Sequence, residues 1–112
     1  MLNFDEFSAL QVLYLTTVGR TTGLPRTIEI WFVAHQGALY LFAEHQHEAH
    51  WVKNIESNSL VHVRVGDAEF DASGRILDFG VDTVLWQTVQ KVAIQKYGWG
   101  DGLPVQLTPV SR

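Results

Sequence analysis

The chain has no cysteine and only three prolines among its 112 residues. Without cysteine there is no disulfide framework, no thiolate nucleophile and no metal site built on thiolates. Charged residues make up only 18% of the sequence and the net charge is −4, which counts against a protein that holds nucleic acid through phosphate contacts. No apolar run approaches the roughly 18 residues of a membrane-spanning helix, and no secretory signal precedes the first predicted strand. We therefore expect a cytoplasmic protein.

Apolar residues make up 46% of the sequence, which is enough to form a hydrophobic core. The low charge content combined with this apolar content also argues against disorder. The chain shows no internal repeat, low-complexity segment or linker, so the sequence predicts one domain over residues 1–112.

Alternation of apolar and polar residues predicts six β-strands. The clearest strand covers residues 60–66, where Val61, Val63 and Val65 alternate with outward-facing His62 and Arg64. The other expected strands cover residues 10–18, 26–34, 38–44, 68–79 with a break near Ser73-Gly74, and 103–110, whose prolines are typical of an edge or a terminus.

Two segments have helical periodicity. In residues 47–57 an apolar residue recurs every three positions, which predicts a short amphipathic helix. Residues 82–97 predict a longer helix that Asp82 caps and Gly98 ends. Six short, mostly antiparallel strands close best into a small barrel, whose interior is filled by its own side chains. A ligand would then lie outside the barrel, beside a helix or between two copies of the chain.

Two arginines flank the glycine-rich turn between the first two strands. Arg20 and Arg26 lie on either side of a Gly-Leu-Pro sequence, and glycines at 19 and 23 allow the backbone to approach an anion closely. The planar guanidinium group suits phosphate or carboxylate. The pattern therefore indicates an anion site, and the alternative is a solvated turn with two surface cations.

Three histidines, His45, His47 and His50, lie close together in the sequence. Histidine is the commonest metal ligand, but the first of these belongs to a strand end and the others to a helix, and their spacing matches no zinc signature. We therefore predict no metal site. We assign these histidines to hydrogen bonding at the helix start or to the lining of a groove beside Trp51.

Several other residues have positions that the pattern alone leaves open. Trp31 and Trp51 fit a groove or an interface better than a core, Trp86 fits the core or helix packing, and Trp99 fits a loop. Asn54 fits the surface of the short helix. The sequence has no nucleophile-elbow serine, no Walker loop and no dinucleotide-binding glycine motif, so no catalytic side chain is identified. If the protein is an enzyme, a bound cofactor would carry the chemistry.

Three segments together resemble the deazaflavin-dependent nitroreductase and quinone reductase family. They are the Gly-Arg-x-x-Gly-x-Pro-Arg motif at 19–26, the strand that follows it, and a Trp-x-x-Asn helix motif at 51–54. This family lies within the split β-barrel flavin-binding group, which includes pyridoxamine-phosphate oxidase. The likeness covers about residues 10–79 and implies a mainly β fold, a six-stranded, mostly antiparallel split β-barrel with two helices.

The resemblance also implies a set of cofactor-binding residues. Arg20, Thr22 and Arg26 would hold the phosphate and the ribityl tail, and the backbone of Thr27 and Ile28 would line the edge of the ring. The end of the third strand would lie along the ring or tail, and the short helix would close the groove. The residues concerned are Ala43, Glu44, His45, His50, Trp51 and Asn54.

The implied cofactor is coenzyme F420 (8-hydroxy-5-deazaflavin) or FMN. Relatives that use the deazaflavin often have a second basic residue where this chain has Thr21, and an Asn-Pro where it has Asn58-Ser59. They often have a longer N-terminal helix as well. The missing cation leaves room for FMN, whose single phosphate needs fewer partners.

The function implied by the resemblance is an oxidoreductase that passes a hydride from the cofactor to a small planar acceptor, such as a quinone or a nitroaromatic. One alternative is a non-catalytic module of the same fold that binds flavin or haem for storage, sensing or delivery. A third is a barrel that has lost its cofactor and only dimerises. Outward-facing aromatic residues and a groove that needs a second wall also predict a homodimer.

Overall fold

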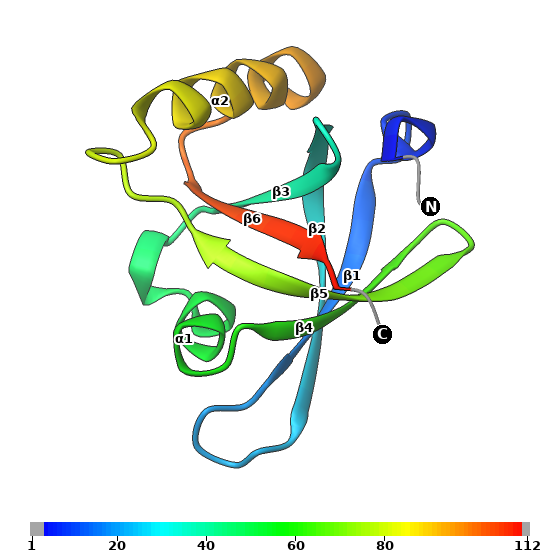
Figure 1. Ribbon diagram of the computed structural model, residues 1–112, viewed down its shortest axis with the longest axis vertical. Coiled ribbons are helices and arrows are strands. Elements are labelled where there is room, and N and C mark those ends of the chain that lie inside the picture. The colour runs from blue at the N-terminus through cyan, green and yellow to red at the C-terminus, as the bar shows by residue number, and fades with distance from the viewer. Residues whose placement is uncertain (1–3, 111–112) are drawn as a thin grey trace.

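Six antiparallel strands form a closed barrel in the computed structural model, which describes residues 4–110 (Figure 1). Neighbouring strands follow the order β1-β2-β3-β6-β5-β4. The strands are β1 (Val12–Val18), β2 (Pro25–His35), β3 (Ala38–Ala43), β4 (Leu60–Val65), β5 (Ala68–Ile76) and β6 (Leu103–Pro109). The helices are α1 (His50–Ser57) and α2 (Thr83–Tyr97), with short 3-10 helices η1 (Phe4–Phe7) and η2 (Gln46–Glu48). The predicted fold class is confirmed.

The interior of the barrel is filled by apolar side chains, as the sequence predicts. Leu13, Phe32 and Leu107 are fully buried in one continuous cluster, and Val52 and Ile55 of α1 extend that cluster beyond the strands. Because the interior is packed, ligand-sized spaces are found on the outside of the barrel. Within the described range, no helix is both long enough and apolar enough to cross a membrane.

The break predicted in the fifth strand is wrong. β5 continues through Ser73 and Gly74, which pair with Thr108 and Leu107 of β6. A Cβ at Gly74 would lie 3.0 Å from Cγ2 of Ile55, so the glycine allows α1 to lie directly against the strand. The glycine that looked like a strand breaker is therefore a point of close approach.

The first helix begins at His50 rather than at residue 47. Residues 46–48 form η2, and Ala49 is extended, with φ −61° and ψ 133°. The extended residue separates the two helical turns and is the N-cap of α1, where its carbonyl accepts the N–H of Lys53 at 3.1 Å.

β6 lies between β3 and β5, so of the two readings of its prolines, an edge or a terminus, the edge is wrong. Pro104 pairs with Phe42 of β3, and its carbonyl accepts a hydrogen bond from the N–H of Leu77 at 3.1 Å. Pro109 is the last residue of the strand. Both prolines lie near strand ends, where a missing N–H interrupts few ladder hydrogen bonds.

α2 covers the outer face of β2 and β3 (Figure 1). Val89 and Ala93 are buried against Tyr40 and its neighbours in a second apolar cluster. The helix ends at Gly98, which has φ +75° and donates its N–H to the carbonyl of Ile94 at 2.8 Å. The predicted glycine stop is confirmed.

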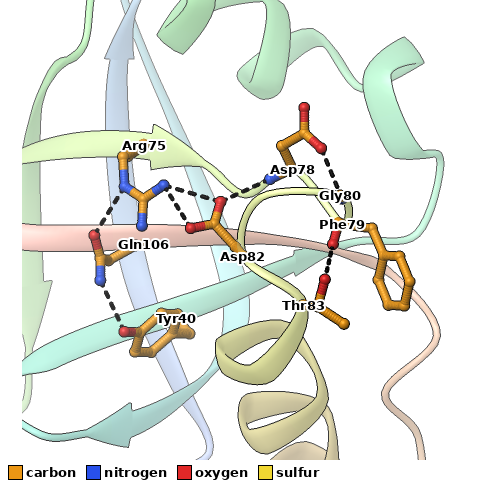
Figure 2. Close-up of polar contacts among 8 residues, drawn as sticks. All are labelled: Tyr40, Arg75, Asp78, Phe79, Gly80, Asp82, Thr83 and Gln106. Atoms are coloured by element: carbon orange, nitrogen blue, oxygen red, sulfur yellow. Dashed lines mark hydrogen bonds and ion pairs between the residues drawn. The ribbon is translucent and has the colours of Figure 1, made fainter.

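The start of α2 is tied to the barrel by a chain of polar side chains (Figure 2). Oδ2 of Asp82 accepts hydrogen bonds from Nη1 of Arg75 at 3.0 Å and from the N–H of Asp78 at 2.9 Å. Nε of Arg75 donates to Gln106 at 3.3 Å, and Gln106 donates to the Tyr40 hydroxyl at 2.8 Å. Asp82 stands at the N-cap position, as predicted, but its side chain makes no cap hydrogen bond. The Asp78 N–H and the Arg75 guanidinium instead lower the pKa of Asp82.

β2 changes its neighbour part of the way along. Residues Pro25 to Trp31 pair with β1, whereas Phe32 to His35 pair with β3. Among residues 4–110, the first part of β2 therefore has a neighbouring strand on one side only. Its free edge lies along the spaces that form the candidate site.

Candidate functional site

The loop between β1 and β2 closes on itself. Gly19 donates its N–H to the carbonyl of Leu24 at 2.8 Å, and Gly23 donates to the carbonyl of Gly19 at 2.7 Å. Gly23 has φ +73°, in the left-handed region that favours glycine. A Cβ at Gly19 would lie 2.8 Å from Oγ1 of Thr22 and 3.0 Å from the Leu24 carbonyl oxygen. This compact turn places Arg20 at the loop's junction with α1.

A buried amide on α1 holds the loop in place. Asn54 is 4% exposed, and its Oδ1 accepts hydrogen bonds from the backbone N–H of Arg20 at 3.2 Å and from Arg20 Nη1 at 2.9 Å. Its Nδ2 donates to Oγ1 of Thr17 on β1 at 3.0 Å, and Thr17 is itself buried. The donors around Oδ1 and the acceptor beside Nδ2 define the orientation of the amide. The expectation that Asn54 is a surface residue is wrong, because these hydrogen bonds compensate for its burial.

The guanidinium of Arg20 lies between Asn54 and His50. Nη1 is 3.4 Å from the carbonyl oxygen of His50, and Nη2 is 3.2 Å from Nδ1 of His50. Within the described part of the chain, the Nε–H and the second N–H of Nη2 have no partner. Arg20 is therefore held in one orientation by α1 and still has donors for a ligand.

Arg26 faces the same space from β2 without such restraint. It is exposed, and among residues 4–110 no hydrogen-bond or ion-pair partner approaches its guanidinium. Thr22 accepts a hydrogen bond from the N–H of Leu24 at 3.2 Å, which leaves its own hydroxyl proton to be donated. This end of the site combines two guanidinium groups with a hydroxyl group, a donor set that suits phosphate.

These side chains line one end of an open groove between the β1–β2 loop and α1. This cationic end has a volume of about 900 Å³. It is lined by Arg20, Thr22, Arg26, Thr27, Ile28, His45, His50, Trp51 and Asn54, all of which the resemblance implied, and by Thr17, Gly19, Thr21, Glu48 and Ala49. The carboxylate of Glu48 pairs with Lys53 at 3.3 Å rather than with either arginine.

A second hollow of about 690 Å³ continues the groove along β2. The two hollows share part of their lining: Ile28, His45, Ala49 and Trp51. The second hollow is further lined by Trp31, Phe42 and Trp99, together with Glu29, Ile30 and Glu44. The groove thus has a cationic end and an aromatic end, joined along the free edge of β2.

Trp31 is fixed in the wall of the aromatic end by α2. Its ring stacks on Tyr97, with centroids 4.4 Å apart and planes 8° apart, and it remains 47% exposed. The Tyr97 hydroxyl accepts the N–H of Phe32 at 3.1 Å and lies 2.6 Å from the Phe32 carbonyl oxygen and 2.8 Å from that of Gln11. Burial raises the pKa of Tyr97 and lowers the pKa of Lys96, whose ammonium donates to the Phe32 carbonyl at 3.1 Å. The end of α2 therefore sets the position of a groove residue.

The four tryptophans occupy different environments. Trp31 and Trp51 line the groove. The sequence pattern favoured a groove or an interface over the core for both residues. Trp86 packs on both apolar clusters and meets Phe79 edge to face, with centroids 5.5 Å apart. Trp99 lies in the loop after α2, as predicted, and its side chain also reaches the groove.

Two residues that the resemblance implied lie away from the cationic end. Ala43 is 1% exposed in the barrel core, and its side chain lines neither end of the groove. Glu44 lines the aromatic end only. The sequence did not single out Phe42 or Glu29 for the groove, because alternation along β2 and β3 does not reveal where the two strands separate.

The histidines that cluster in the sequence are divided in space. His45 and His50 line the cationic end, whereas Nδ1 of His47 lies 3.9 Å from the carboxylate of Glu56. Across residues 4–110, no group of three or more histidine, cysteine, aspartate or glutamate side chains is placed to hold a metal ion.

Comparison with known proteins places this geometry in context. The family model described as F420H(2)-dependent quinone reductase matches residues 4–107. No curated protein matches the chain. Among solved structures, the heme storage protein HutZ from Vibrio cholerae is similar with a TM-score of 0.77 and 21% identity, over 97% of this chain and 89% of that chain.

Two further structures share the fold. An F420-H2 dependent reductase (FDR-A) has a TM-score of 0.66 and 23% identity, over 88% of this chain and 93% of that chain. A FAD-binding protein from Mesorhizobium loti has a TM-score of 0.73 and 15% identity, over 98% of this chain and 91% of that chain. At these identities the structural likeness establishes the barrel fold alone.

Proposed function

The chain belongs to the F420H2-dependent quinone reductase family, and from this premise we propose that it is a flavin-type oxidoreductase. It binds coenzyme F420 or FMN and passes a hydride to a small planar acceptor, a quinone or a nitroaromatic. The observation that carries the proposal is the two-ended groove along the free edge of β2. When bound, the cofactor supplies the hydride chemistry, and the chain supplies binding and orientation.

The cationic end fits the phosphate of either cofactor. Arg26 is exposed without a partner among residues 4–110, and Arg20 is oriented by Asn54 while keeping unused donors. The net charge of the chain is −4, so two guanidinium groups without a paired carboxylate are a local exception that favours an anionic ligand. FMN and the deazaflavin coenzyme both offer phosphate oxygens for these donors.

The rest of the groove fits a flat ring system. From Thr27 to Trp31, the backbone of β2 hydrogen-bonds to β1 on one side, and its other edge faces the groove. Backbone N–H and C=O groups require partners, and the polar edge of a flavin-type ring has both acceptors and a donor. Trp51 and Ile28 lie where the two ends of the groove meet, so a ring beside β2 would contact apolar side chains on its faces.

The aromatic end provides the place for the acceptor. Trp31, Phe42 and Trp99 line it, and aromatic side chains favour offset stacking with flat conjugated molecules. A planar quinone or nitroaromatic there would lie next to the ring-binding segment of the groove, as direct hydride transfer requires. These side chains would also exclude water from the reacting atoms.

A non-catalytic binding module is the second candidate. HutZ is described as a heme storage protein, and this chain also has two groove histidines, His45 and His50. Such a module would bind flavin or haem without turnover. Nδ1 of His50 already contacts Arg20, which favours a hydrogen-bonding role for this histidine over a role as a haem ligand.

The test is three titrations followed by a turnover assay. FMN and coenzyme F420 are titrated into separate samples of the purified protein, and haem into a third. The protein is then mixed with the reduced form of whichever cofactor binds and with menadione, and cofactor oxidation is compared with a protein-free control. Binding with accelerated oxidation supports the proposal, binding without acceleration supports the storage module, and no binding of FMN or F420 overturns the proposal.

We also propose that the functional form is a homodimer. The groove is open to the surface, and Trp31 in its wall is 47% exposed, so a second copy could complete the enclosure. Light scattering at micromolar concentration with cofactor present should give twice the mass of the chain. A mass of one chain under those conditions would contradict this proposal.

A further inference from the structure

We infer that His50 donates a hydrogen bond from its Nε2–H to the cofactor phosphate and that Arg20 fixes its tautomer. The inference rests on the proposed function, because it concerns the same groove. It assigns His50 a specific atom, Nε2–H, and a specific partner, a phosphate oxygen.

The tautomer follows from the contact between the two side chains. Nη2 of Arg20 lies 3.2 Å from Nδ1 of His50. A guanidinium has hydrogen-bond donors only, so Nδ1 must be the acceptor and cannot carry a proton. A neutral imidazole then has its single proton on Nε2.

The contact is built into the fold rather than formed by two free surface chains. Nη1 of the same guanidinium donates to Oδ1 of Asn54 at 2.9 Å, and Asn54 is 4% exposed. The backbone N–H of Arg20 donates to the same oxygen at 3.2 Å. Because the buried amide is in turn fixed by Thr17, the guanidinium is held against His50 by groups of the chain itself.

The remaining ring nitrogen is available to the groove. His50 is exposed and lines the cationic end, and among residues 4–110 its Nε2 has no hydrogen-bond partner. Arg20 and Arg26 line the same end, which is where an anionic group would bind. Phosphate oxygens accept hydrogen bonds, so an Nε2–H donor complements them and adds no further positive charge to the site.

Two amide substitutions separate the two nitrogens of His50. Asparagine can place an acceptor near Nδ1 but has no group at the position of Nε2, whereas glutamine can place an N–H near Nε2. His50→Asn should therefore weaken binding of FMN or F420 about tenfold or more, and His50→Gln should weaken it less. His47→Asn is the matched control, because His47 does not line the groove, and it should leave the affinity unchanged.

The tautomer is measured independently, by long-range ¹H–¹⁵N NMR of the full chain without cofactor at about pH 8, above the ordinary histidine pKa of about 6.5. His50 should show the Nε2–H tautomer, and the ¹⁵N resonance of its Nδ1 should be shifted by the hydrogen bond that it accepts. Arg20→Met should remove that shift. An Nδ1–H tautomer, or equal affinities for His50→Asn and the wild type, would overturn the inference.

Inorganic phosphate, followed through the His50 resonances, distinguishes failure of this inference from failure of the proposed function. If the wild type binds neither cofactor, the proposed function is overturned. If inorganic phosphate then shifts the Nε2–H resonance of His50 in the wild type, the donor role of His50 is still supported. If phosphate or a cofactor binds without moving that resonance, the donor role is overturned.

Discussion

Replacing Asn54 by leucine should destabilise the fold, although the two side chains have similar shapes. The amide is 4% exposed and makes hydrogen bonds to Arg20 and Thr17. Leucine would fill the same space and would leave those groups without their partner. The two partners differ in their access to water, and this difference sets the size of the effect.

The larger part of the cost comes from Thr17. Its side chain is 1% exposed, so water cannot replace the lost amide, and a buried polar group without a partner costs about 1–3 kcal/mol. Arg20 is exposed, so its donors regain water and contribute less. The free energy of unfolding should therefore fall by about 2–3 kcal/mol, which for a domain of this size lowers Tm by roughly 10 °C.

A double-mutant cycle tests this reasoning by urea or thermal unfolding. Thr17→Val alone should destabilise the protein, because Nδ2 of Asn54 then loses its acceptor. In the Asn54→Leu background, Thr17→Val should instead recover about 1 kcal/mol, because no buried hydroxyl is left without a partner. Strictly additive effects, or an Asn54→Leu protein as stable as the wild type, would refute the argument.

Three further predictions concern charged groups. Arg26→Ala should weaken binding of FMN or F420 about tenfold or more by titration, since a charge-assisted hydrogen bond is worth about 1.5–3 kcal/mol, and should leave Tm unchanged. The control is Lys91→Ala, at an exposed position of α2 that lines neither end of the groove, and it should leave the affinity unchanged. His62 donates hydrogen bonds to two carboxylates of β5, and these raise its pKa above 6.5. Its contribution to the free energy of unfolding is therefore fully present below pH 6.5 and disappears as the pH rises through the raised pKa. Urea unfolding at several pH values should therefore show the stability difference between the wild type and His62→Gln shrinking as the pH rises beyond 6.5, and a constant difference would contradict this. Asp82 has a lowered pKa, so its pH dependence is opposite to that of His62. Its contribution to stability is present above pH 3.8 and is lost as the pH falls through the lowered pKa. Asp82→Asn should therefore be as stable as the wild type only in acid.

The strands and the second helix could be predicted because their signals are local. Val61, Val63 and Val65 alternate in sequence and are all buried in β4, since a strand sends successive side chains to opposite faces. Val89 and Ala93 lie one helical turn apart and form the buried face of α2. Closure of six short antiparallel strands then follows because it gives every strand two neighbours over at least part of its length.

The arrangement of the candidate site could be predicted only in part. The two arginines and the helix residues came from motifs, but the burial of Asn54 depends on Thr17 and Arg20, which are distant in sequence. The aromatic end depends on where β2 leaves β1 and joins β3, and no periodicity within one strand encodes a change of neighbour. The strand break predicted at Gly74 is wrong for the same reason, because the role of this glycine is set by Ile55 of another element.

The Tyr97 hydroxyl links the solvent exchange of one backbone amide to the docking of a helix. The N–H of Phe32 donates to this hydroxyl on α2 at 3.1 Å, at the residue where β2 changes partners. Exchange of this amide with deuterium therefore requires α2 to lift from the barrel. Because Trp31 stacks on Tyr97, the same opening removes a wall of the groove. A ligand that needs this wall should slow exchange at Phe32, which makes this amide a reporter of occupancy at a site it does not contact.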